Sequence, residues 1–77
     1  MIEAAQIRAA RALIEWSQTE LAEASALALS TIRRMEVAGG TLKSSVENVL
    51  KVQQALEGAG VIFIDRNESA GPGVRLK

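Results

Sequence analysis

Two adjacent arginines lie in a short segment whose other outward residues are small, polar or apolar groups. Within Leu29 to Glu36, Ile32 and Met35 are three residues apart, so they form the inward face of a helix. Around them, the helix projects Leu29, Ser30, Thr31, Arg33 and Arg34 on an outward surface. An arginine binds O6 and N7 of guanine, a hydroxyl donates or accepts a hydrogen bond, and an apolar group contacts the thymine methyl. This is the layout of a helix that lies in the major groove of DNA.

Other kinds of chemistry lack their usual residues in this chain. It contains no histidine, cysteine or tyrosine, so the commonest general base and the thiolate metal ligands are absent. The acidic residues are scattered over expected solvent-facing helical positions. The run Gly71-Pro72-Gly73 is not followed by the Gly-Lys-Ser/Thr of a phosphate-binding loop. We therefore expect no enzyme activity, no cofactor and no metal.

Length and composition indicate one small globular domain. The chain has 77 residues, of which 48% are hydrophobic. A core of this size is marginally stable, which favours a homodimer. No apolar run approaches the roughly 18 residues of a membrane span and no signal peptide is visible, so we expect no membrane association and a cytoplasmic protein.

The formal net charge is zero, which is unusual for a nucleic-acid-binding domain. The charges are unevenly distributed, however. Residues 1–28 carry two arginines and four glutamates, residues 29–51 carry four basic and two acidic residues, and residues 52–77 are balanced. The positive part of the chain therefore coincides with the segment that has the groove-binding layout.

Periodicity predicts three more helices around this segment. The first runs from Glu3 to Glu15, followed by Trp16, which we expect to cover the corner between the first two helices. The second opens with a capping box, Ser17 with Glu20. The last runs from Ser45 to Glu57 and opens with a second box, Ser44 with Glu47. The apolar faces consist of Ile7, Ala10, Leu13 and Ile14 in the first helix, Leu21 and Ala22 in the second, and Val46, Val49, Leu50, Val52 and Leu56 in the last.

The end of the chain changes from helical to strand character. Val61–Ile64 and Val74–Leu76 are short β-branched or aromatic runs, joined by the turn-rich loop 65–73. We read them as a β-hairpin with Val61 and Phe63 on one face and Ile62 and Ile64 on the other. A small helical core covers only one of these faces. We therefore expect the hairpin to contact a second copy of the chain or a different protein.

The segment from Gln18 to Glu36 resembles the helix-turn-helix of Cro/repressor-type regulators, the Xre family. The resemblance rests on Gln18, Leu21, Ala22, Leu27, Ser30, Thr31, Ile32, Arg34 and Glu36, and the preceding run AARALIEWSQ is similar to the family's first helix. Ala26 stands where the family has glycine, and Ala28 where it often has a capping Ser or Thr. The resemblance implies a mainly α, lambda-repressor-like helix-turn-helix bundle of about four helices, to which the sequence adds a C-terminal β-hairpin.

The resemblance also assigns roles to individual residues. Leu29, Ser30 and Arg34 would read bases, while Thr31 and Arg33 would touch phosphates or flanking bases. Ser17 and Gln18 would cap the second helix and contact a phosphate, and Lys43 would lie against the DNA backbone from loop 37–44. An ion pair would join Arg11 to Glu36. Arg8 is either a solvated charge or a further phosphate contact.

Two hypotheses of function follow. In the first, residues 1–60 are a helix-turn-helix domain that binds double-stranded operator DNA sequence-specifically, and residues 61–77 are a hairpin tail for a dimer or partner contact. A two-fold dimer would place two recognition helices one DNA turn, roughly 34 Å, apart, and would act as a repressor. In the second, the chain is a protein-interaction module, such as the antitoxin of a toxin–antitoxin pair, with the hairpin binding the partner.

Overall fold

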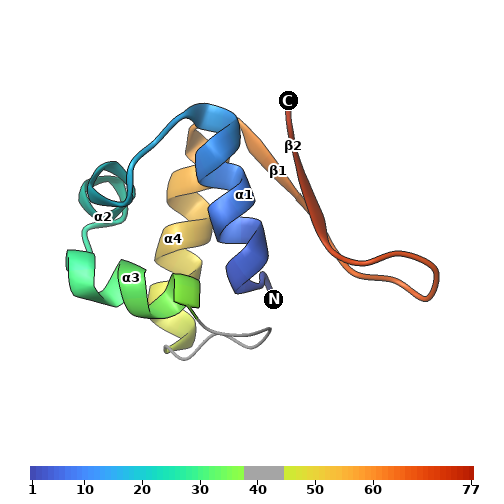
Figure 1. The fold of residues 1–77 in the computed structure, drawn as a ribbon, viewed down its shortest axis with the longest axis horizontal. Coiled ribbons are helices and arrows are strands. Elements are labelled where there is room, and N and C mark those ends of the chain that lie inside the picture. Colours follow the sequence, from blue (N-terminus) through green and yellow to red (C-terminus); the bar gives the residue numbers. More distant parts are fainter. Residues whose placement is uncertain (38–44) are drawn as a thin grey trace.

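The computed structural model describes residues 1–37 and 45–77, which form four helices followed by a two-stranded antiparallel hairpin (Figure 1). The elements are α1 (Ala4–Ile14), α2 (Gln18–Ser25), α3 (Leu29–Val37), α4 (Val46–Gly58), β1 (Val61–Ile64) and β2 (Gly73–Leu76). In Figure 1, α1 and α4 run side by side, α3 crosses below them, and the hairpin extends on the side of α1 away from α2. The predicted mainly helical fold with a C-terminal hairpin is confirmed.

The core collects apolar side chains from every helix and from β1. Its fully buried members are Ile7 and Ala10 of α1, Leu21 of α2, Ile32 and Met35 of α3, Val49, Val52 and Leu56 of α4, and Val61 of β1. Trp16 is half-buried against this cluster, as expected for a residue that covers the corner between α1 and α2.

Three residues assigned to apolar faces are exposed instead: Leu13 (41%), Val46 (59%) and Leu50 (45%). Val49, Val52 and Leu56 define the buried stripe of α4. Leu50 lies about 100° around the helix from Val49, and Val46 is the first residue of the helix. The predicted apolar faces were therefore too wide.

Serine side chains cap the starts of α2 and α4. In α2 the predicted capping box is present, because Ser17 Oγ accepts from the Glu20 N–H and Glu20 Oε1 accepts from the Ser17 N–H, each at 3.0 Å. In α4 the predicted box pairs Glu47 with Ser44, which lies outside the described residues. The N-cap is Ser45, whose hydroxyl accepts from the Asn48 N–H at 3.2 Å. Two consecutive serines offer equivalent caps, and the register of the helix selects the second.

Two helices end on residues in the left-handed region without glycine. Ala26, after α2, has φ 58°, and Glu15, after α1, has φ 57°. The turn into α3 thus needs the positive φ that the position of Ala26 suggested, at a cost of roughly 1 kcal/mol relative to glycine. The sequence carried no signal for the same conformation at Glu15.

The hairpin pairs Val61 with Leu76, Ile62 with Arg75, Phe63 with Val74 and Ile64 with Gly73. Val61, Phe63 and Val74 pack on the core, whereas Ile64 is 43% exposed, so the predicted separation of the two faces is confirmed.

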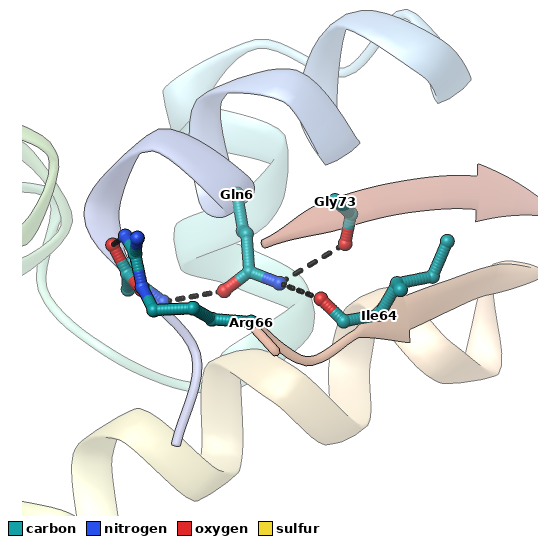
Figure 2. A network of polar contacts seen from close by, with 5 residues as sticks. Gln6, Ile64, Arg66 and Gly73 are labelled. Carbon is teal, nitrogen blue, oxygen red and sulfur yellow. Dashed lines mark hydrogen bonds and ion pairs between the residues drawn. The ribbon is translucent and has the colours of Figure 1, made fainter. Parts of the chain in front are cut away.

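A polar network attaches the hairpin to the start of α1 (Figure 2). The buried Gln6 side chain donates through Nε2 to the carbonyl oxygens of Ile64 (3.1 Å) and Gly73 (3.0 Å), while its Oε1 accepts from the Glu3 N–H at 2.7 Å. Beside it, the Arg66 guanidinium pairs with the Glu3 carboxylate at 3.1 Å. Both strands are thereby held against one helix.

Candidate nucleic-acid interface

Helix α3 has one face in the core and one face in solvent. Ile32 and Met35 are 1% exposed and form the inward stripe, as the spacing of three predicts. Ser30, Arg33 and Arg34 are exposed, and Leu29 and Thr31 are half-buried. Five of the predicted contact residues thus lie on one helix, with Ser30, Arg33 and Arg34 exposed. Leu29, predicted to face outward, packs partly against the core.

The exposed face of α3 is positively charged. Neither Arg33 nor Arg34 forms a hydrogen bond or an ion pair with any residue in the described part of the chain. Their guanidinium groups, each with five N–H donors, are therefore available for a ligand that supplies acceptors.

The one acidic residue of α3 is turned inward and neutralised. Glu36 is 3% exposed, and the Arg11 guanidinium holds its carboxylate in a two-point interaction, Nε to Oε2 and Nη2 to Oε1, each at 2.7 Å. The predicted Arg11–Glu36 pair is confirmed. Arg11 also donates through Nη1 to the Trp16 carbonyl oxygen at 3.0 Å, so one side chain joins α1, the α1–α2 corner and α3.

The contact with Glu36 keeps Arg11 protonated. The hydrogen bond to Glu36 raises the pKa of Arg11 above its ordinary value. The negative charge of Glu36 acts in the same direction, and partial burial opposes both. Arg11 is therefore a permanent cation and cancels the charge of Glu36 inside the protein.

Two further residues contact Glu36. Gln18 donates through Nε2 to Glu36 Oε1 at 3.2 Å. Arg8 donates through Nη1 to the backbone carbonyl oxygen of Glu36, where a cation complements the negative end of the α3 dipole. The expectations for Arg8 missed this helix-capping contact, because its acceptor is a backbone atom 28 positions away.

The other residues predicted to contact DNA are Ser17, Gln18 and Lys43. Ser17 and Gln18 stand at the start of α2, and the capping role of Ser17 is confirmed. Lys43 lies outside the described residues. Glu20 and Glu23 on α2 are exposed. Val37, 80% exposed at the end of α3, was assigned to the following loop, yet it extends the solvent face of the helix.

Neither a scan of protein-family models nor a search of curated proteins finds a match for this chain. The candidate interface is therefore supported by the exposed residues of α3 and by the contacts that hold this helix in place.

Proposed function

We propose that this protein is a sequence-specific regulator that binds double-stranded DNA with the outward face of α3 and represses transcription by occupying an operator. The observation that carries the proposal is the sorting of charge on this helix. Arg33 and Arg34 point to solvent without partners among the described residues, while Glu36 is buried and paired with Arg11. A groove-binding helix must present donors to an anionic ligand and must keep carboxylates away from it.

The residues of α3 divide between base and backbone contacts. Arg34 is the candidate for a bidentate bond to guanine, and Ser30, exposed one turn earlier, accepts or donates to either base of a pair. Leu29 is half-buried, which leaves only part of its side chain for a thymine methyl group. Arg33 and Thr31 are assigned to phosphates or flanking bases. These contacts together set both register and specificity.

The proposed supporting contacts come from the start of α2 and from Lys43, which follows α3 in the sequence. In the proposal, backbone N–H groups at Ser17 and Gln18 face a phosphate, since a helix N-terminus attracts anions. The Gln18 side chain already bonds to Glu36, so its phosphate contact would come from the backbone. Lys43 adds a contact to the DNA backbone.

The cluster around Glu36 supports the proposal by fixing the position of α3. Arg8 and Arg11 reach it from α1, and Gln18 reaches it from α2. A recognition helix held in this way loses little conformational freedom when it binds DNA, which favours affinity.

Selection from a random double-stranded DNA library tests the proposal. Wild type should enrich an inverted repeat whose half-sites are one helical turn apart. Arg34→Ala should lose discrimination at one base pair of each half-site, worth about 1–3 kcal/mol. Lys51→Ala is the matched control, because Lys51 is a basic residue on α4 with a side chain 43% exposed, outside both α3 and the hairpin. No enrichment at low salt, or equal loss in both variants, would overturn the proposal. The first of these results would favour a protein-interaction module such as an antitoxin.

A further inference from the structure

The outer strand of the hairpin has an unpaired edge. Lys77 N–H bonds to the Gly60 carbonyl oxygen at 2.9 Å, which fixes the alternation of the antiparallel ladder. In that alternation Gly73 and Arg75 bond to β1, whereas the N–H and C=O groups of Val74 and Leu76 point away from it. In Figure 1, β2 is the strand farther from α4, and α1 packs against the hairpin. Apart from the ladder with β1, no backbone hydrogen bond among the described residues reaches these groups of Val74 and Leu76.

The edge is presented in a fixed orientation and is partly apolar. Gln6 and the Glu3–Arg66 pair hold the loop end of the hairpin to α1. Close to the edge, Leu76 is 45% exposed and Ile64 is 43% exposed. A rigid strand with free backbone donors and acceptors is a template for pairing with another strand.

We propose that β2 pairs antiparallel with β2 of a second copy, with Val74 opposite the partner's Val74, so that two hairpins form one four-stranded sheet. This inference rests on the proposed function, which requires a two-fold dimer, and it specifies the surface and the register.

Repulsion between like charges favours a two-fold axis at Val74 over an axis at Arg75 or at Leu76. A two-fold axis at Arg75 would place Arg75 directly opposite the partner's Arg75, and an axis at Leu76 would place Arg75 opposite the partner's Lys77. Like charges directly opposite each other destabilise a sheet. An axis at Val74 places Arg75 opposite the partner's Gly73, which has no side chain to repel it. It also places Leu76 opposite the partner's Pro72, whose carbonyl accepts the Leu76 N–H but which has no N–H to donate.

The same register brings opposite charges together. Each hairpin carries Arg75 and Lys77 at the end of β2. Its loop carries the exposed acids Asp65 and Glu68 beside Arg66, whose charge is paired with Glu3. Antiparallel pairing about Val74 lays the basic end of one copy beside the acidic loop end of the other. The arrangement is therefore self-complementary, as a two-fold interface must be.

The interface is small. A stable complex of standard size buries about 800 Å² of each partner, and the whole protein exposes 4594 Å². Pairing of one four-residue strand covers much less than the standard area, so free dimers should be weak. Two neighbouring half-sites on one duplex would raise the effective concentration and complete the pairing.

Single cysteines test the register, because the chain has none of its own. Gly73 and the partner's Arg75 form a non-hydrogen-bonded pair in the proposed sheet, close enough for a disulfide. A mixture of Gly73→Cys and Arg75→Cys should therefore form a covalent dimer on mild oxidation at high protein concentration, several-fold above either variant alone. A Cβ at Gly73 would meet only ordinary contacts, the closest at 3.8 Å to Ile64, so this variant should fold.

One control variant and two results decide whether the proposed register is correct. Leu13→Cys is the matched control, because Leu13 is similarly exposed but lies on α1. A mixture of Gly73→Cys and Arg75→Cys that cross-links no more than Gly73→Cys with Leu13→Cys would overturn the proposal. So would a dominant disulfide in Arg75→Cys or Leu76→Cys alone, which would indicate an axis at Arg75 or Leu76.

Cross-linking and DNA selection test the two proposals independently. If the protein forms the mixed disulfide but selects no DNA motif, the result supports the four-stranded sheet and contradicts the DNA-binding proposal. A protein that selects an inverted repeat but forms no mixed disulfide binds DNA and dimerises elsewhere or only through the DNA.

Discussion

Removal of the Arg11 guanidinium should be among the most destabilising single changes in this protein. Arg11→Met keeps an unbranched apolar stem and deletes the charge, which leaves the Glu36 carboxylate 97% buried with only the Gln18 amide as a side-chain donor. Loss of one partner of a buried ion pair costs about 3–5 kcal/mol. Since Arg11 itself is 20% exposed, we expect the lower end of this range, about 3 kcal/mol.

The loss expected for Arg11→Met is large relative to the total free energy of unfolding of so small a chain. At about 0.05–0.15 kcal/mol per residue, a protein of this length has about 4–12 kcal/mol in total. Urea unfolding followed by the fluorescence of Trp16, the single tryptophan, gives the midpoint, and an unchanged slope would show that the two-state transition is preserved.

A double variant separates the ion pair from simple packing. Arg11→Met combined with Glu36→Leu removes both charges, so no uncompensated carboxylate remains, and it should be more stable than Arg11→Met alone. Arg66→Met is the control, because it breaks a pair whose arginine is 62% exposed and should cost at most about 1 kcal/mol. Equal losses for Arg11→Met and Arg66→Met would refute the reasoning.

The pH dependence of the same pair has a definite sign. The pKa of Arg11 is raised by its bond to Glu36, so its contribution to stability is present below the ordinary arginine pKa and is lost only as the pH rises through the raised value. Moderately alkaline pH should therefore produce no unfolding transition from this residue.

Three other changes have definite expected outcomes. Ala26→Gly should raise the free energy of unfolding by roughly 1 kcal/mol in urea, because glycine adopts φ 58° without strain; a loss of stability would contradict the assigned conformation. Gln6→Leu should cost about 1–3 kcal/mol and accelerate hydrogen exchange of the β1 and β2 amides, which an exposed control, Gln54→Leu on α4, should leave unchanged. Arg33→Ala should weaken DNA binding uniformly across sequences and reduce the slope of log K against log salt by about one; an altered base preference without a change in slope would assign Arg33 to the bases instead.

Much of the fold was predictable because it is encoded locally. Apolar spacing identified the four helices, and the Ser17–Glu20 box identified the start of α2 to the residue. The sequence also predicted the hairpin, since β-branched runs flank a loop rich in glycine. The predicted bounds of the last helix, Ser45 to Glu57, were off by one residue at each end, since α4 is Val46–Gly58.

The features that escaped prediction depend on distant backbone atoms. Gln6 bonds to carbonyl oxygens 58 and 67 residues away, and Arg8 bonds to the carbonyl of Glu36. Every residue has a carbonyl group, so no residue type marks these acceptors in the sequence. Arg11 and Glu36 were paired through the resemblance to a known family, and the structure places them in direct contact.

The most direct test of DNA recognition by α3 is the change in backbone amide chemical shifts when an operator duplex selected by the protein is added. The largest changes should fall on the outward positions of α3, at Ser30, Arg33 and Arg34, and at the start of α2, at Ser17 and Gln18. The inward residues Ile32 and Met35 should move less. Changes confined to the hairpin, or spread without preference over the surface, would contradict recognition by α3.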